Sequence, residues 1–285
     1  MKIRKFFIIS FLLIFSLIFT SCKQQTTQKS IWTTIYPIYS ITKIIAQDKI
    51  EVYKVIKDGA EVHSFEPTTK DIAKMSDSLG VFYIGLIDDW AKKSLDGTQT
   101  KVYKVSKGID IQNYDPHIWN SPKNAIILAK NIKDALSQID KDNALFYQKN
   151  FYKFQKEMLS IDKELKKISL KAKNKVFLIS HPSFGYLANE YNLVQYSITG
   201  LNEEEEPSPA KIREIIKLIK QKNIRYLLYD PNENINIIKP IINETKIKTV
   251  EVYGMGVSSS DMSKNQTYIG LMKKNLLAIK KALLE

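Results

Sequence analysis

The chain has 285 residues, of which 44% are hydrophobic, and this suits a folded protein of one or two domains. Its formal net charge is +13, but the lysines are spread along the chain and form no nucleic-acid-binding motif. We therefore exclude nucleic acid as a partner and interpret the lysines as a solvated surface with a weak attraction for anionic membranes. Because Cys22 is the only cysteine, the fold cannot depend on an internal disulfide.

The N-terminal stretch is typical of an exported and anchored protein. Residues 1–5 are basic, and residues 6–20 form an apolar stretch as long as a signal peptide but too short for a membrane span. Cys22 follows this stretch, in an order that resembles the lipobox of bacterial lipoproteins, although Phe19 stands where leucine is usual. We expect Cys22 to carry a lipid that anchors the protein to the bacterial membrane.

Strands and helices alternate through the first half of the mature chain. Thr68 and Asp71 have the spacing of a capping box, and Ser121 followed by Pro122 is typical of a helix start. Hydrophobic periodicity predicts strands at 31–37, 50–56, 79–84 and 101–105, and helices at 39–47, 68–75 and 87–95.

One long helix is predicted over residues 144–172. Apolar residues recur there at intervals of three and four, and lysines and acids fill the other faces. At ~1.5 Å per residue, such a helix would be roughly 43 Å long. A coiled-coil strand or a bundle helix would have this pattern too, but its place between two similar strand–helix alternations indicates a rigid linker.

The alternation resumes after this helix. Strands are predicted at 175–180, 193–199, 224–229 and 248–253, and helices at 183–190, 208–221, 235–244 and 267–284, with Ser183 and Ser208 as caps and a polar loop at 254–265. These elements predict an α/β fold of two parallel-sheet lobes joined by one long linker helix. The expected division is a signal peptide at 1–21, a tether at 22–29, an N-terminal lobe at 30–141, the linker helix at 142–173 and a C-terminal lobe at 174–285.

The only three histidines, His63, His117 and His181, each follow a predicted strand. Ligands of parallel sheets bind beyond the carboxyl ends of the strands, so the three imidazoles should converge if the lobes face each other. Three neutral imidazoles suit a divalent cation, with Zn²⁺ first and Mn²⁺ or Fe²⁺ as less favoured alternatives. Since zinc prefers four ligands, a carboxylate or a water must complete the site.

The sequence motifs around the histidines support the same interpretation. The segments are Gly59-Ala-Glu-Val-His63-Ser-Phe-Glu-Pro, Asp115-Pro-His117-Ile-Trp and Ser180-His181-Pro-Ser-Phe-Gly, followed by Glu206-Pro-Ser-Pro209. In this order they resemble the metal-binding receptors of bacterial ABC importers, the zinc/manganese class, over nearly all of the mature chain. The resemblance implies a two-lobed, lipid-anchored receptor outside the cytoplasm that delivers its ion to a membrane permease. It also implies that the three histidines are ligands, with a histidine at the third position favouring zinc over manganese.

The fourth ligand departs from the family pattern. The position of the family's aspartate falls on Tyr253, and a neutral phenol is a poor ligand for a divalent cation. Glu251, Asp261, Glu61 or a water could take its place, and Glu251 is our candidate among them.

Three further carboxylates are expected to support the ligands. Asp115 could orient His117 by accepting a hydrogen bond from it, although aspartate before proline is also common in turns. Glu61 lies two residues before His63, and Asp230 ends a predicted strand, where it could face the cleft or cap the next helix.

These observations favour a monomeric zinc receptor of an ABC importer, with no enzymatic activity. The alternatives are a manganese or iron receptor of the same family, a zinc-dependent hydrolase, and a surface adhesin. A hydrolase would use a water on the three-histidine site, with Glu61 or Asp115 as the base, but a lipid-anchored two-lobed receptor does not call for such a base.

Overall fold

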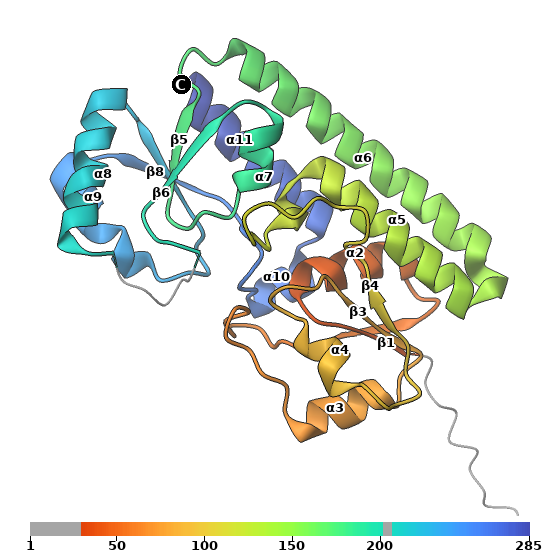
Figure 1. Cartoon of the computed structure of the whole chain (residues 1–285). Helices are drawn as coiled ribbons and strands as arrows, with labels where there is room; N and C mark the ends of the chain where they lie inside the picture. The colour runs from red at the N-terminus through yellow and green to blue at the C-terminus, as the bar shows by residue number, and fades with distance from the viewer. Residues whose placement is uncertain (1–29, 202–206) are drawn as a thin grey trace, which may run out of the picture.

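Two α/β lobes lie side by side along a long helix in the computed structural model of the chain (Figure 1). The structure describes residues 30–201 and 207–285. The expected signal peptide, the lipidation site Cys22 and the tether lie outside these residues, as does Glu206 of the last family-like segment. No helix within the described ranges has both the length and the apolar character needed to cross a bilayer.

The N-terminal lobe is built on a parallel sheet with the strand order β2-β1-β3-β4. Its strands are β1 (Ser30–Thr33), β2 (Glu51–Lys54), β3 (Gly80–Tyr83) and β4 (Val102–Lys104), and its helices are α2 (Tyr36–Ala46), α3 (Thr69–Ser76) and α4 (Trp90–Ser94). The predicted capping box is present at the start of α3. The Thr68 hydroxyl accepts from the Asp71 N–H at 3.2 Å, and the Asp71 carboxylate accepts from the Thr68 N–H at 3.1 Å.

The C-terminal lobe repeats this topology with the strand order β6-β5-β7-β8. Its strands are β5 (Val176–Ile179), β6 (Val194–Ser197), β7 (Tyr226–Tyr229) and β8 (Lys248–Glu251), and its helices are α7 (Gly185–Glu190), α8 (Pro209–Lys222), α9 (Lys239–Thr245), α10 (Ser260–Asn265) and α11 (Tyr268–Leu284). The prediction of two parallel-sheet lobes is therefore confirmed.

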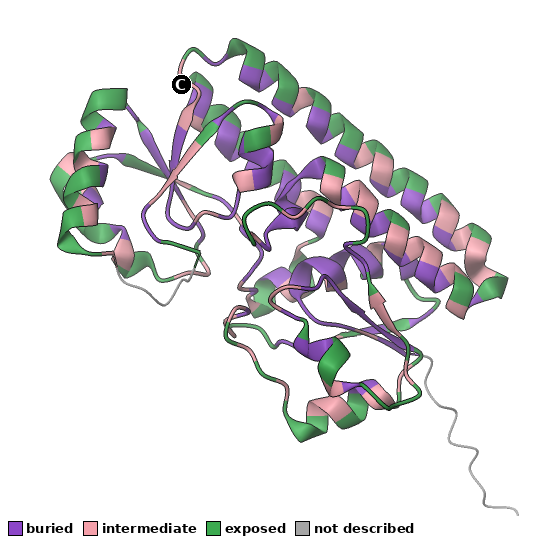
Figure 2. Cartoon of the chain, in the orientation of Figure 1, coloured by how far each residue is buried: buried purple, intermediate pink, exposed green. Residues whose placement is uncertain are grey.

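The long helix α6 (Ala144–Lys171) follows α5 (Pro122–Ile139) and packs against α5, α2 and α11. Its apolar stripe faces inward, while its outer face is exposed along its length (Figure 2). The buried apolar members of the stripe are Tyr147, Phe151, Phe154, Met158, Ile161, Leu165 and Ile168. They belong to one hydrophobic core that runs from the N-terminal sheet through α6 and α11 to β5 and α7. The helix therefore joins the lobes through packing as well as through the chain.

The structure differs from the predicted elements at four places. The strand predicted at 31–37 ends at Thr33, and Tyr36 already begins α2, which has a proline in its first turn. Ser183 does not cap α7, because its N–H donates to the His181 carbonyl in a tight turn and the helix begins at Gly185. The helix predicted at 235–244 is split into a 3-10 turn (Ile235–Ile237) and α9, which has a proline in its first turn. The loop predicted at 254–265 contains α10, whose cap is the hydroxyl of Ser259.

A second connection between the lobes is formed by residues 252–267, which we call the return segment. It leaves β8 in the C-terminal lobe and leads into α11. On its way it contacts the N-terminal lobe, since the carbonyl of Gly254 accepts from Trp119 Nε1 at 2.8 Å and from Asn120 Nδ2 at 3.0 Å. Further along, the Tyr36 hydroxyl donates to the Met262 carbonyl at 3.3 Å.

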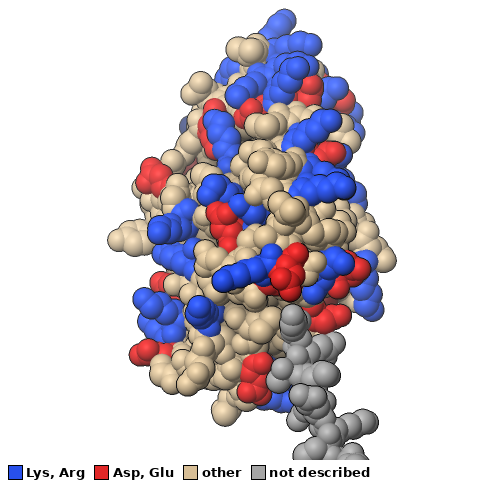
Figure 3. Space-filling model, turned by 90° about the vertical axis from the view of Figure 1, so that its right-hand side faces the viewer, with Lys and Arg blue, Asp and Glu red and all other residues tan. Residues whose placement is uncertain are grey.

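Charged side chains are dispersed over the surface. On the face shown in Figure 3, Lys and Arg extend from one end of the molecule to the other, with Asp and Glu between them. This face has the solvated, mixed-charge character that the sequence suggested.

Candidate metal centre

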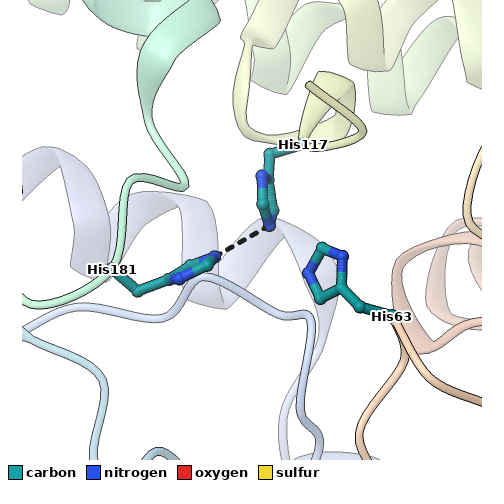
Figure 4. A group of neighbouring side chains, drawn as sticks. All are labelled: His63, His117 and His181. Carbon is teal, nitrogen blue, oxygen red and sulfur yellow. Dashed lines mark hydrogen bonds between the residues drawn. The ribbon is translucent and has the colours of Figure 1, made fainter. Parts of the chain in front are cut away.

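Three imidazoles converge between the lobes (Figure 4). One ring nitrogen each of His63, His117 and His181 lies within 4.8 Å of the other two. His63 is in the loop after β2, His117 is in the loop after β4, and His181 follows β5 after a single residue. All three loops leave the carboxyl ends of parallel strands, which explains why residues so far apart in the chain meet.

The rings are arranged for a common ligand and not for stacking. The ring centroids of His117 and His181 are 4.9 Å apart with planes at 73°, and those of His63 and His117 are 5.4 Å apart with planes at 55°. The Nε2 atoms of His117 and His181 are 3.2 Å apart. With Zn–N bonds of about 2.0–2.1 Å, two ligand nitrogens of a tetrahedral site lie about 3.3 Å apart. The observed separation therefore fits a tetrahedral cation with little adjustment.

Asp115 fixes the ring of His117. Its Oδ1 is 2.7 Å from His117 Nδ1 and also accepts from the His117 backbone N–H at 2.9 Å. The proton shared with the carboxylate is therefore on Nδ1, and the Nε2 lone pair faces the other two rings. Gly185 packs against Asp115, since a Cβ there would lie 2.9 Å from Asp115 Oδ2.

Burial keeps the other two imidazoles neutral. Loss of solvent lowers the pKa of His63 and that of His181, and repulsion from His117 lowers both further. Neutral imidazole is the form that binds a metal. His63 Nε2 is buried and has no hydrogen-bond partner among the described residues. An orphaned buried nitrogen costs about 1–3 kcal/mol, which a bound cation would offset.

An aromatic wall closes one side of the cluster. Trp119 is fully buried and lies edge-on to His117, with ring centroids 5.3 Å apart. Its Nε1 donates to the Gly254 carbonyl, so the indole is held between the N-terminal lobe and the return segment. This wall limits the access of water to His117.

A cavity of about 200 Å³ lies beside His181 and is lined by Glu61, Asp230 and Glu233, among other residues. Glu61 Oε1 accepts from the His63 backbone N–H at 2.9 Å, so its carboxylate is held near the cluster. Asp230 is buried, and this raises its pKa to about 6. Its Oδ2 accepts from the Gly254 N–H at 2.7 Å, which ties the end of β7 to the return segment.

Glu251 is not where the sequence analysis expected it. Within the described residues, neither Glu251 nor Asp261 belongs to the group of neighbouring ligand atoms. Glu251 is exposed at the end of β8, and its carboxylate accepts from the hydroxyls of Tyr229 at 3.4 Å and Tyr253 at 3.3 Å. The Tyr253 ring lies 5.1 Å from the ammonium of Lys274 on α11. The end of β8 therefore directs both side chains toward other partners.

Sequence reasoning missed the role of the return segment. Gly254 makes the main contacts of this segment: the Gly254 carbonyl accepts from Trp119, and the Gly254 N–H donates to Asp230. A Cβ at this position would lie 2.9 Å from the Oγ of Ser183, two residues after His181. The glycine itself was the only sequence signal of this close approach.

Comparison with known proteins agrees with this geometry. Residues 31–282 match the family described as zinc-uptake complex component A, periplasmic. The chain is 33% identical to the high-affinity zinc uptake system protein ZnuA of Bacillus subtilis (strain 168) over 276 residues, which cover 88% of this chain and 86% of that protein. It is 30% identical to the zinc-binding lipoprotein AdcA of Streptococcus pneumoniae, but it spans only 56% of that relative's length.

Solved structures give the same result. The Zn(II)-bound ZnuA-like domain of Streptococcus pneumoniae AdcA has a TM-score of 0.80 and 31% identity, covering 90% of this chain and 100% of that one. The laminin-binding protein Lmb of Streptococcus agalactiae, described as bifunctional with adhesin and metal-transporting activity, has a TM-score of 0.82 and 30% identity, covering 90% of this chain and 99% of that one. The chain therefore belongs to the family of periplasmic zinc-uptake complex component A proteins.

Proposed function

We propose that this chain is an extracytoplasmic receptor that captures Zn²⁺ and delivers it to the permease of an ABC importer. The observation that carries the proposal is the group of three imidazoles whose ligand nitrogens lie within 4.8 Å of one another. The neutral state of His63 and His181 and the orphaned nitrogen of His63 both favour a cation at this point. Family membership supports the same conclusion.

The chemistry of the donors favours zinc. Three imidazoles suit a borderline-soft dication, whereas Mn²⁺ prefers more oxygen ligands and gains less from nitrogen donors. His63, His117 and His181 are the proposed ligands. A water takes the fourth position, or the carboxylate of Glu61 after a shift toward the ion, because Glu61 lies outside the group of ligand atoms but is held beside it by the His63 N–H.

The proposed setting is the outer surface of the cell membrane. A lipid on Cys22 would hold the protein there, with residues 22–29 as the tether, and the protein would act as a monomer. In this position the receptor meets both the ions outside the membrane and its permease.

The proposed receptor performs no turnover. Asp115 is engaged by His117, and Glu61, which accepts from the His63 N–H, is here a candidate fourth ligand. Neither is therefore assigned as a base for a zinc-bound water. Ester and phosphoester substrates should therefore remain intact in the presence of the zinc-loaded protein.

Zinc titration tests this function. Residues 23–285 would be titrated with Zn²⁺ by calorimetry, together with the variants His63→Ala, His117→Ala and His181→Ala. Each variant should lose at least tenfold in affinity. Asp261→Ala serves as the control, because it removes an exposed carboxylate whose hydrogen-bond partner within the described ranges is Asn265 on its own helix. Zinc binding by the three histidine variants at the affinity of the wild type would refute the proposal.

Laminin binding is a second candidate, because the similar Lmb protein is described as an adhesin. Immobilised laminin would be exposed to the wild-type protein and to the histidine variants. Binding that persists without zinc would support a separate adhesive surface, and absence of binding would remove this candidate.

A further inference from the structure

Four polar side chains join the loop that carries His63 to the return segment. Lys54 ends β2, Asp58 lies four residues later, and Ser258 and Ser263 come from the return segment; we call these four residues the clasp. Lys54 Nζ lies 2.6 Å from Asp58 Oδ1 and donates to Ser258 Oγ at 2.5 Å and to Ser263 Oγ at 3.3 Å. One ammonium group thus bonds both lobes.

The hydrogen bonds of the clasp form a closed network, because both serines bond Asp58 as well as Lys54. The hydroxyls of Ser258 and Ser263 donate to Asp58 Oδ1 at 2.8 Å and 2.6 Å. Next to them, the Gly59 N–H donates to the Ser258 carbonyl at 2.7 Å. Only 9% of the Lys54 side chain is exposed, and its ammonium lies 5.5 Å from the centre of the Tyr36 ring. The charge is therefore largely desolvated, and its partners come from two distant parts of the chain.

Such an arrangement fixes the relative position of the two elements more than it adds to the free energy of unfolding. The Lys54 side chain is buried and that of Asp58 is 32% exposed, and such an ion pair gains little net free energy, because desolvation of the ammonium offsets most of the attraction. Its directional hydrogen bonds nevertheless fix the elements that carry them in one relative position. Here these elements are the start of the His63 loop and the return segment.

His63 is the imidazole that most needs this support. His117 is buried and fixed by Asp115, and His181 is buried just beyond the end of a central strand. His63 is only partly buried and lies in the middle of a loop, five residues beyond Asp58. Among the described residues its ring has no partner of the kind that Asp115 provides for His117.

We infer that Lys54 and Asp58 are positioning residues for His63, which hold its loop against the C-terminal lobe and thereby set how long the bound ion is retained. This inference rests on the proposed zinc-receptor function. When the clasp opens, His63 is the first ligand to leave, because the other two are fixed independently. The ion is then held by two imidazoles and dissociates faster.

The test is the zinc dissociation rate of Lys54→Met, which removes the ammonium but retains the apolar stem. The zinc-loaded protein would be mixed with an excess of a fluorescent chelator in a stopped-flow instrument. Loss of a group that orients a metal ligand typically costs about 10–100-fold in affinity, so release should be at least tenfold faster. Lys130→Met is the matched control, because Lys130 and Asp134 form an exposed pair at 2.9 Å with the same spacing in α5. Its release rate should equal that of the wild type.

A second readout separates positioning from general stability. The chain contains three histidines, so nitrogen-labelled protein gives three sets of imidazole signals by NMR. In zinc-loaded Lys54→Met, the His63 signals should shift or broaden, while those of His117 and His181 stay in place. Ser258→Ala removes a single hydroxyl and tests the same point if Lys54→Met does not fold. It should accelerate release about tenfold, as expected for the loss of a hydrogen bond to a charged group.

Two results would overturn the inference. The first is zinc release from Lys54→Met that is no faster than release from Lys130→Met; if Lys54→Met does not fold, Ser258→Ala takes its place in this comparison. The second is an equal change in all three sets of imidazole signals. A wild-type protein that does not bind zinc would instead refute the proposed function. The two failures are therefore distinguishable.

Discussion

The hydrogen bond between Asp115 and His117 makes a quantitative prediction about zinc affinity. Asp115→Ala removes the acceptor of His117 Nδ1, at 2.7 Å, and the acceptor of the His117 backbone N–H, at 2.9 Å. Without the carboxylate, the proton can reside on either ring nitrogen, and the ring can turn. The variant should therefore bind zinc more weakly while it keeps all three imidazoles.

The size of the effect follows from the burial of the pair. Side-chain exposure is 1% for His117 and 15% for Asp115, so solvent screens their interaction little. Loss of a partner of this kind lowers metal affinity about 10–100-fold, which corresponds to ~1.4–2.7 kcal/mol. Asp115→Asn keeps an oxygen acceptor without the charge and should lie near the lower end of this range, at about tenfold.

Competition with a chelator of known affinity would measure the three dissociation constants. The order should be wild type, then Asp115→Asn, then Asp115→Ala, from tight to weak. Asp261→Ala is the control, since Asp261 is exposed and its hydrogen bond in the described part of the chain is to Asn265. An unchanged affinity in Asp115→Ala would show that the orientation of His117 does not depend on Asp115, and the reasoning would fail.

Three further predictions concern pH, stability and packing. Burial, with repulsion from His117, lowers the pKa of His63 and that of His181, so both imidazoles stay neutral below the free-imidazole pKa of about 6.5. Zinc affinity, measured by titration across pH, should therefore persist through pH ~6.5 and fail only at more acid pH. Asp88 is fully buried and accepts from one hydroxyl and two backbone N–H groups, so Asp88→Ala should lower the free energy of unfolding by about 3 kcal/mol or more in urea denaturation. Gly254→Ala would place a Cβ 2.9 Å from the Oγ of Ser183 and should cost about 1–3 kcal/mol in the same assay. A midpoint of zinc binding at 6.5, or unfolding curves that match the wild type, would contradict these expectations.

The local features of the fold could be predicted from the sequence. The capping box at Thr68 and the start of α5 at Ser121 depend on residues within one turn, and both are present. The convergence of the histidines followed from their places after strands, because a parallel sheet brings strand ends to one edge. These predictions succeeded because each depends on short-range pattern or on a general rule of topology.

Contacts that depend on the relative position of the lobes could not be predicted. Whether Glu251 reaches the histidines depends on the direction of the end of β8, where Tyr229 and Tyr253 are its partners. Likewise, Ser258 and Lys54 are 204 positions apart, and nothing near either residue indicates their hydrogen bond. α10 was missed because Ser259 and Asp261, which begin it, are equally common in loops.

The two connections between the lobes restrict their motion. α6 alone would allow bending, but the return segment ties the lobes at a second place through Trp119 and Gly254. Beyond it, the Tyr268 hydroxyl at the start of α11 donates to the Trp119 carbonyl, so this link continues into the core. A hinge rotation would break these buried hydrogen bonds and shear a hydrophobic core that both lobes share.

Zinc release should therefore proceed through local loop movement and not through opening of the lobes. The His63 loop is the element to move, because His63 is the only partly exposed imidazole of the three. Spin labels on α3 and α8, one in each lobe, would report the distance between the lobes with and without zinc. We expect the distance distributions to coincide, while hydrogen exchange in residues 57–65 increases when zinc is removed. A shift of the distance distribution on zinc removal would mean that the lobes rotate, and that α6 and the return segment are too weak to prevent it.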